Sequence, residues 1–279
     1  MSSQITTAFV EQYSNNVTML SQQKGSLLRD NVDSETVQGK NAFFEQIGSV
    51  AAVKRTSRHG DTPQLDTPHA RRRVSLVDYE YADLIDDQDK IRTLIDPTSS
   101  YAQAAAFAMG RAMDDEIIAA ATGTAFTGVS GGTSTSLPAG QAITESGTDG
   151  LTIAKLREAK RTFDLASVDP SIKRYMVVSP RQIDDLLGTT SVTSADFNTV
   201  RALVTGEVNT FMGFEFIVSN RLSIASSKRL CFAYAADGIK LAIGKDVMSR
   251  IDERSDKGYS TQVYYCASFG ATRMEEEKV

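Results

Sequence analysis

The stretch from Val53 to Asp96 most constrains the fold, because it is too polar to form a compact unit of its own. Its first half carries basic side chains, interrupted by glycine and proline: Lys54, Arg55, Arg58, Arg71, Arg72 and Arg73. Its second half carries acidic ones: Asp78, Glu80, Asp83, Asp86, Asp87 and Asp89. So little apolar surface cannot offset the entropy lost on ordering the chain. The segment is therefore either disordered or ordered by other chains.

We interpret this stretch as an extended hairpin made for assembly. Alternation of period two from Arg73 to Tyr81 predicts a strand, with Val74, Leu76, Tyr79 and Tyr81 as its only apolar positions. A basic arm beside an acidic arm suits complementary contacts between copies of the chain. The residues predicted to make intersubunit contacts are Lys54, Arg55, Arg58, Arg71, Arg72, Arg73, Asp86 and Asp87.

The composition is that of a folded protein with a core built largely from aliphatic and alanine side chains. The chain has 279 residues, a net charge of −5, 41% hydrophobic and 8% aromatic residues, and no Trp. This length suffices for one large domain or two small ones. No apolar run approaches the roughly 20 residues of a membrane helix, and the start of the chain shows no secretory signal pattern. Cys231 and Cys266 lie in apolar runs, which predicts buried reduced thiols and synthesis in the cytosol.

A long helix is the clearest element of the sequence. Asp96 can cap it, Pro97 suits its first turn, and Gly123 is the expected left-handed terminator. Small and flexible side chains form a stripe along it, which predicts close packing against a sheet: Tyr101, Ala105, Ala108, Ala112, Met109, Met113 and Ile117. Before this helix, residues 1–48 predict a weakly amphipathic helical arm and a strand over Val37–Ile47.

The second half of the chain predicts a compact α/β region and a final strand. Residues 123–150 are rich in Gly, Ser and Thr, which indicates a flexible loop or a turn-rich hairpin. A helix over 153–163 and a buried strand over 174–179 follow, and Ser179 with Gln182 matches a capping box that opens another helix. Strands are predicted over 214–219, 229–235, 239–243 and 260–270. The charged tail after Arg273 is expected to fray.

The sequence contains no combination of residues that indicates catalysis or cofactor binding. His59 and His69 lack Cys or Glu partners at metal-ligand spacing. Asp114, Asp115 and Glu116 occupy successive helical positions and point in different directions, so they cannot converge on one substrate. No phosphate loop, nucleophile elbow or dinucleotide fingerprint occurs. We therefore predict no enzyme activity, no cofactor and no metal, and the mild acidity gives no reason to expect sequence-specific nucleic-acid binding.

Several segments resemble the major capsid proteins of tailed bacteriophages, whose α+β fold was first seen in phage Hong Kong ninety-seven and is called the Johnson fold. These segments read VKRTSRHGDTP, PHARRR, DKIRTLIDPTSSYAQ and YMVVSPRQIDDLL. The resemblance covers essentially the whole chain. It implies an N-terminal arm over 1–48, an extended E-loop over 49–83, a peripheral P-domain over 84–148 and 246–279 with its spine helix at 97–122, and an axial A-domain over 149–245.

The resemblance also implies a function and partners. Copies of the chain would assemble through pentamers and hexamers into the icosahedral head around phage double-stranded DNA, in the host bacterial cytoplasm. Separate scaffolding, portal and decoration proteins would be further partners, DNA would touch the inner face without sequence specificity, and no membrane is involved. Lys54 lies where some relatives form an isopeptide crosslink, but no motif identifies an Asn partner.

Two alternatives stay open at this point. A bacterial encapsulin nanocompartment shell shares the fold and differs in its cargo. A polysaccharide- or nucleotide-acting enzyme belongs to another class, and the lack of a catalytic constellation argues against it.

Overall fold

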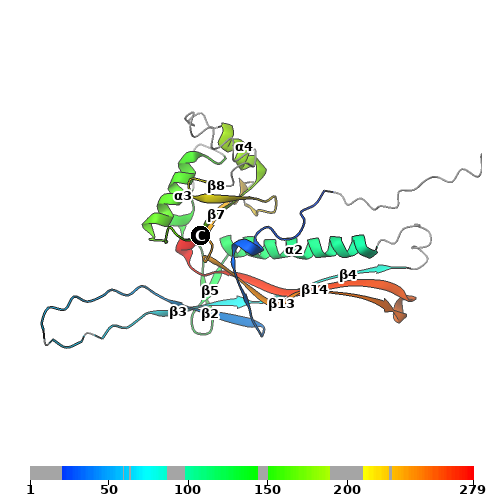
Figure 1. Cartoon of the computed structure of the whole chain (residues 1–279), viewed down its shortest axis with the longest axis horizontal. Coiled ribbons are helices and arrows are strands. Elements are labelled where there is room, and N and C mark those ends of the chain that lie inside the picture. Colours follow the sequence, from blue (N-terminus) through cyan, green and yellow to red (C-terminus); the bar gives the residue numbers. More distant parts are fainter. Residues whose placement is uncertain are drawn as a thin grey trace, which may run out of the picture.

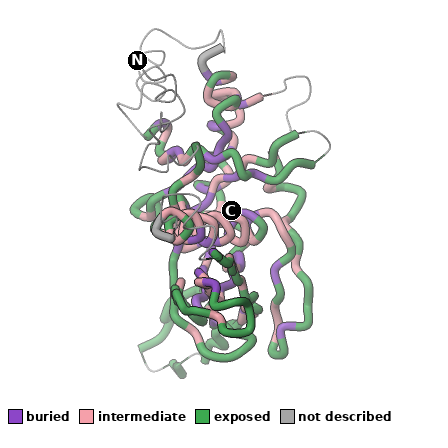
Figure 2. The backbone as a smooth tube through the Cα atoms, turned by 90° about the vertical axis from the view of Figure 1, so that its right-hand side faces the viewer, coloured by how far each residue is buried: buried purple, intermediate pink, exposed green. Residues whose placement is uncertain are grey.

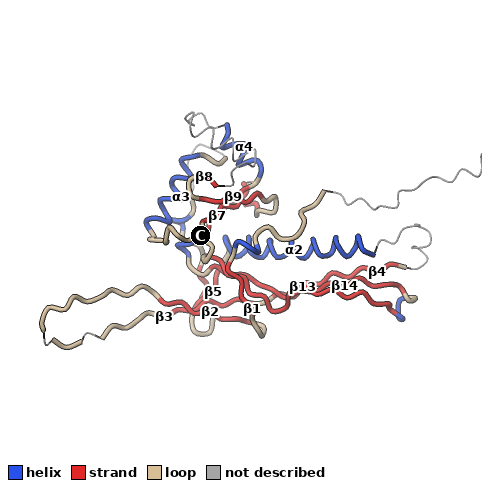
Figure 3. The backbone as a smooth tube through the Cα atoms, viewed as in Figure 1, coloured by secondary structure: helices blue, strands red, loops and turns tan. Residues whose placement is uncertain are grey.

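The computed structural model describes residues 21–58, 60–62, 64–86, 98–143, 150–188, 210–225 and 228–279. It confirms the α+β class: one long helix, two shorter ones and several sheets (Figures 1 and 3). In Figure 1 the long helix α2 (Thr98–Thr122) lies along a sheet of long strands, and a smaller α/β unit stands at its C-terminal end. A hairpin projects on the same side as this unit, beyond the rest of the chain.

The sheet beneath α2 has the strand order β1-β13-β14-β4. Its members are β1 (Asp33–Thr36), β13 (Ile239–Arg254), β14 (Ser260–Arg273) and β4 (Val77–Ile85). β13 runs antiparallel to β14 and parallel to β1. The predicted alternation along the final strand is confirmed, because Val263, Ala267 and Phe269 are buried on one face of β14.

The spine helix buries a stripe at intervals of four residues. Ala105, Met109, Met113 and Ile117 are all buried, and the last three pack in one core with β13 and β14. Ala108 and Ala112 are half-buried and Tyr101 is exposed, so the close-packed face is centred on Ala105 and Met109 and excludes Tyr101. In Figure 2 the buried residues run along the middle of the molecule, and exposed residues form its outer segments.

The helix ends where predicted, but the predicted conformation of Gly123 is wrong. The Gly123 N–H donates to the Ala119 carbonyl at 2.8 Å, and the residue does not adopt a positive φ. A Cβ atom at this position would lie 2.4 Å from the Ala119 oxygen, so glycine is needed for close approach. The predicted cap at Asp96 and Pro97 lies outside the described residues.

The smaller unit is a sheet of order β12-β7-β9-β8 with two helices. Its strands are β7 (Arg174–Val178), β8 (Thr210–Phe211), β9 (Phe214–Val218) and β12 (Phe232–Ala235), and its helices are α3 (Ile153–Leu165) and α4 (Pro180–Gly188). All five residues of β7 are buried, as predicted. The predicted capping box is present in part: the Ser179 N–H donates to the Gln182 side chain at 3.0 Å. A separate small ribbon joins β10 (Ile224–Ala225) to β11 (Lys228–Arg229).

The third sheet has the order β2-β3-β5-β6 and carries the projecting hairpin. Its strands are β2 (Asn41–Ile47), β3 (His69–Ser75), β5 (Ala125–Thr127) and β6 (Thr133–Thr135). The last two form a hairpin, so the Gly/Ser/Thr-rich segment is a turn-rich hairpin rather than a flexible loop. Single 3-10 turns complete the chain: Arg29–Asn31, Ala139–Gln141, Ser255–Lys257 and Glu276–Lys278.

The basic and acidic halves of the polar stretch are not two arms of one hairpin, which corrects the prediction. β3 pairs with β2, whereas the acidic strand β4 pairs with β14 in the sheet beneath α2. The reason is packing: Tyr79 and Tyr81 pack against the core under α2, and the Tyr79 ring stacks on Phe269 at 4.7 Å. The two tyrosines therefore place β4 in the larger sheet.

Three further predictions are wrong: the end of the strand at residue 243, the fraying of the C-terminal tail, and the burial of the two cysteines. β13 continues through Arg254 across the expected domain boundary at 245, because its charged second half still pairs with β14. The C-terminal tail, predicted to fray, is held by ion pairs: Lys278 contacts Asp237 at 2.7 Å and Glu275 at 2.8 Å. Cys231 and Cys266 are free thiols and only half-buried. In the described part of the chain, no helix has the length and apolar character needed to cross a bilayer.

Candidate functional site

The tip of the projecting hairpin is the most exposed feature of the chain. β2 and β3 pair from Asn41 and Ser75 to Ile47 and His69, and one further bond joins the Gly48 N–H to the Pro68 carbonyl at 2.9 Å. We call residues 48–68 the hairpin tip. Every described residue of the tip is exposed, and Figure 1 shows the tip reaching beyond the sheets. Its backbone groups are therefore available to another molecule.

The structure divides the predicted contact residues into two groups. Lys54, Arg55 and Arg58 lie on the tip, are exposed, and form no ion pair with any described residue. The Arg55 guanidinium donates only to the Ser57 carbonyl, at 2.8 Å. These three side chains fit the predicted role of reaching another copy.

Arg71, Arg72 and Arg73 instead have partners in their own chain at the root of the hairpin. Arg71 pairs with Glu45 at 2.7 Å. Arg73 lies over the Phe126 ring, with its guanidinium carbon 4.7 Å from the ring centroid. Arg72 is buried, pairs with Glu276 at 2.6 Å and donates to the Met274 carbonyl at 2.9 Å. These three therefore hold the hairpin to its own subunit.

The root of the hairpin is joined to the end of the spine helix through the C-terminal tail. Arg273 is fully buried and donates to the Ala121 carbonyl at 3.0 Å and the Gly123 carbonyl at 2.9 Å. It thus satisfies carbonyls that the end of a helix leaves without partners. Glu276 lies 3.7 Å from Arg273 and also accepts from Arg72. Burial lowers the pKa of the Arg273 guanidinium, and the nearby Glu276 carboxylate opposes this shift.

Three successive carboxylates in the middle of α2 bind three different parts of the chain. Asp115 pairs with Arg221, which precedes the β10–β11 ribbon. Glu116 accepts a hydrogen bond from the Tyr79 hydroxyl of β4. Burial and this hydrogen bond raise the pKa of Tyr79 well above its ordinary value. The prediction that these carboxylates point in different directions is confirmed, and their role is structural.

The third carboxylate, Asp114, fixes the N-terminal arm to the helix. It is fully buried and accepts from the Leu27 N–H at 3.0 Å, the Leu28 N–H at 3.1 Å and the Ser26 hydroxyl. One turn earlier, Gly110 lets the arm touch the helix backbone, because a Cβ there would lie 2.5 Å from the Gly25 carbonyl carbon. Sequence reasoning missed this contact, and the only signal for it was a glycine inside an otherwise regular helix.

Of the acidic residues in the predicted set, Asp86 directly follows β4. Asp86 accepts from the Ser260 hydroxyl, and Asp87 lies outside the described residues. Asp78 and Glu80 are exposed on the same strand. Glu80 accepts from the Tyr264 hydroxyl at 2.9 Å, which raises the pKa of Tyr264 to about 12. β4 is the last strand of its sheet, so its outer edge presents unpaired backbone groups beside these carboxylates.

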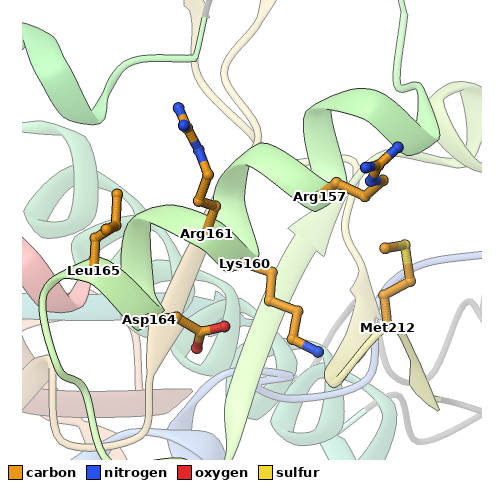
Figure 4. A pocket seen from close by; sticks show the side chains of 6 residues that line it. All are labelled: Arg157, Lys160, Arg161, Asp164, Leu165 and Met212. Carbon is orange, nitrogen blue, oxygen red and sulfur yellow. The ribbon is translucent and has the colours of Figure 1, made fainter.

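A surface hollow of the α/β unit has no catalytic arrangement of side chains. It is an open hollow of about 470 Å³ beside α3, lined by Arg157, Lys160, Arg161, Asp164, Leu165 and Met212 (Figure 4). Arg161 pairs with Glu158 and Asp164 with Arg174, both pairs within one subunit. In the ranges that the structure describes, no three His, Cys, Asp or Glu side chains come together as metal ligands. The hollow offers a basic surface and no nucleophile.

Solved structures with a similar fold include phage capsids. The structure is similar to the capsid of cyanophage P-SCSP1u, with a TM-score of 0.75 and 19% identity over 98% of this chain and 92% of that one. It is also similar to a structure from Mycobacterium phage Che8 (TM-score 0.70, 14% identity, 97% and 95% covered). A third is the capsid of cyanophage Pam1 (TM-score 0.69, 15% identity, 98% and 94% covered). No curated protein sequence matches significantly.

These similarities establish the fold, and the family follows from the sequence itself. Residues 5–279 match the family described as phage capsid protein, a range that includes the spine helix, the sheet beneath it, the smaller α/β unit and the projecting hairpin. The chain therefore belongs to the phage capsid protein family and is a major capsid protein with the fold first seen in phage Hong Kong ninety-seven.

Proposed function

We propose that this major capsid protein assembles through pentamers and hexamers into a closed icosahedral head around phage double-stranded DNA. The observation that carries the proposal is the hairpin: its root is fixed by buried contacts, and no hydrogen bond or ion pair joins its tip to any other described segment of the chain. A tip of this kind loses entropy on ordering without burying apolar surface, so it needs a neighbouring subunit. Repetition around a shell supplies that neighbour for every copy.

The partner of the tip is an acidic edge strand, β4 of an adjacent copy. Lys54, Arg55 and Arg58 supply positive charge, Asp78 and Glu80 supply negative charge on β4, and Asp86 directly follows that strand. The outer edge of β4 and the extended tip both offer free backbone hydrogen-bonding groups. Pairing an extended segment with a sheet edge satisfies these groups, and the charges select the partner.

The other parts of the proposal follow from membership of the family. We assign the chain before β2 to the N-terminal arm, the β2–β3 hairpin to the E-loop, α2 with β4, β13 and β14 to the P-domain, and residues 149–238 to the A-domain. β4 and the first part of β13 belong to the sheet under α2, so they go with the P-domain. We expect no enzymatic role, assembly in the host cytoplasm with separate scaffolding, portal and decoration proteins, and DNA on the inner face without sequence specificity. An encapsulin-like shell is not better supported, because the family match is to phage capsid proteins.

Two triple variants test the proposal. Replacing Lys54, Arg55 and Arg58 by Ser should leave the melting temperature of the subunit unchanged and lower the yield of closed particles in negative-stain electron microscopy. Replacing Arg71, Arg72 and Arg73 by Ser removes the same charge but also removes the buried Arg72 side chain and leaves the partly buried Glu276 carboxylate without it, so it should unfold the subunit at lower temperature. Normal particle yield from the tip variant would contradict the role of the tip. A wild-type chain that forms no closed particles would contradict the shell.

A further inference from the structure

The outer half of β13 is an exposed sheet edge, which Arg29 contacts only near its start, by pairing with Asp246. β1 pairs with β13 only from Lys240 to Ile243. The strand is buried up to Ile243 and exposed over almost all of Gly244–Arg254. No described strand pairs with this second half on the side away from β14. The apolar side chains of Met248 and Ile251 are 42% and 51% exposed on it.

This edge has the regular geometry that strand pairing needs. Two irregularities interrupt the register between β13 and β14, one between Ile243 and Lys245 and one between Lys245 and Met248. From Met248 to Arg254 the register is unbroken. Irregularities of this kind are one way in which proteins protect an edge, and here they stop before the exposed segment begins. Residues 248–254, which we call the free edge, are therefore a template for another strand.

The charges of the free edge are self-complementary in one register. In an antiparallel pair, directly opposite residues lie on the same face, so two copies related by a two-fold axis can only pair about a residue. Pairing about Ile251 places Arg250 opposite Asp252 of the second copy, and does so twice by symmetry. Pairing about Arg250 or Asp252 would instead set like charges opposite each other, which is unfavourable.

We propose that the free edge binds the free edge of a second copy of this chain, antiparallel and centred on Ile251. Arg250 and Asp252 are exposed, and neither forms an ion pair with a described residue, so both charges are available for this contact. They lie on one face, opposite Tyr264 and Gln262 of β14. Ile251 lies on the other face, opposite the buried Val263 of its own chain. In the pair it would pack against Ile251 of the second copy.

The overlap fits the rest of the subunit. Seven residues from each copy pair, and β1 ends beside Ile243, outside the overlap. The two sheets become one continuous sheet, with both α2 helices on the same face. The acidic edge β4 cannot pair with itself in this way, because Asp78, Glu80 and Asp83 carry one sign of charge. As a contact within a shell the inference rests on the proposed function, since a closed icosahedral shell contains two-fold axes between subunits.

A register-specific crosslink tests the pairing. In a chain with Cys231→Ser and Cys266→Ser, Ile251→Cys places two thiols directly opposite each other, within reach of a disulfide. The matched control Met248→Cys lies on the same exposed edge, but its two copies would be about 20 Å apart, six residues at ~3.4 Å each. We expect dimer bands on non-reducing gels of oxidised assembled material for Ile251→Cys and none for Met248→Cys.

Particle formation is scored separately by electron microscopy. Closed particles in which Ile251→Cys forms no crosslink, or in which Met248→Cys crosslinks equally, overturn the pairing and leave the shell intact. Protection of the Ile251→Cys thiol from alkylation without dimer formation also overturns it, because another segment would then cover the edge. A crosslink at Ile251→Cys in material that forms no particles supports the pairing and contradicts the proposed shell.

A charge exchange provides a second test. Arg250→Asp alone sets Asp opposite Asp, and Asp252→Arg alone sets Arg opposite Arg, so each should lower the dimer yield of the Ile251→Cys chain several-fold. The double variant exchanges the two charges and restores two opposite pairs, so the yield should return toward that of the parent. Equal loss in all three variants would overturn the pairing. The far-ultraviolet circular dichroism spectrum of each variant confirms that the subunit is folded.

Discussion

Asp114→Ala should separate the N-terminal arm from the spine helix. The carboxylate is fully buried and accepts hydrogen bonds from Leu27, Leu28 and Ser26, residues that lie almost 90 positions earlier in the chain. Alanine leaves these donors without an acceptor. Leu28 is fully buried, so its N–H cannot turn to water, whereas Leu27 is 39% exposed and its N–H can be hydrated.

The expected cost follows from this difference. A buried donor left without a partner costs about 1–3 kcal/mol, and a lost hydrogen bond to a charged group is worth ~1.5–3 kcal/mol. Removing the buried carboxylate recovers part of its desolvation cost, which offsets some of this loss. We therefore expect a decrease of about 2–4 kcal/mol in the free energy of unfolding of the unassembled subunit. For a chain of this size that corresponds to a melting temperature lower by roughly 4–12 °C.

The neighbouring residue provides the control. Asp115→Ala removes an ion pair with Arg221 in which both side chains are about one-third exposed or more, so it should cost only ~0.2–1 kcal/mol. Urea denaturation measures both variants, and hydrogen exchange measures the protection of residues 26–28. Protection at these amides should fall in the Asp114 variant and persist in the Asp115 variant. Equal stability of the two variants would refute the reasoning, because burial of Asp114 would then contribute nothing.

Two further predictions concern packing and pH. Ala105→Leu should lower the free energy of unfolding measured in urea by ~1–3 kcal/mol, because Ala105 is fully buried. The control Ala119→Leu lies on the exposed side of the helix and should change it little. Similar values for the two variants would mean that the helix face is not closely packed. The hydrogen bond from Arg29 holds the pKa of the Asp246 carboxyl below its ordinary value, so the pair stabilises the fold above about pH 4 and the gain is lost as the pH falls through the lowered folded-state pKa. Asp246→Asn should therefore cost ~0.2–1 kcal/mol at pH 7 and nothing at strongly acidic pH, and a cost that is the same at both pH values would contradict the assignment.

Features with a local period could be predicted from the sequence. The alternation of Val263, Ala267 and Phe269 and the four-residue spacing of Ala105, Met109 and Met113 place one face of each element in the core, because side-chain direction follows directly from backbone geometry. The start of α4 was also predictable, since a capping box acts over three residues. The exposed basic residues of the hairpin tip belong here too, because the sequence around them has no regular apolar pattern that could bury one face.

Contacts between distant parts of the chain could not be predicted. Glu276 looks like a solvated residue in a charged tail, yet it accepts from Arg72, which lies 204 positions earlier. Asp114 is one of three successive acidic residues and alone is buried, because the arm happens to cross the helix beside Gly110.

The sequence by itself determined that this chain has a long helix, an α/β unit, a final long strand and a strongly charged segment. The expectation that this segment is disordered or ordered by other chains is wrong for β3 and β4, which pair with strands of their own chain. Only the tertiary structure decided which strands pair. The acidic strand β4 pairs with β14, because Tyr79 buries apolar surface by stacking on Phe269 and a polar hairpin would offer it no such contact. The charged half of β13 is an edge because, among the described strands, β14 pairs with it on one side and β1 ends before it on the other. Strand pairing depends on surfaces brought together from distant positions in the chain, and a local sequence pattern does not specify those contacts.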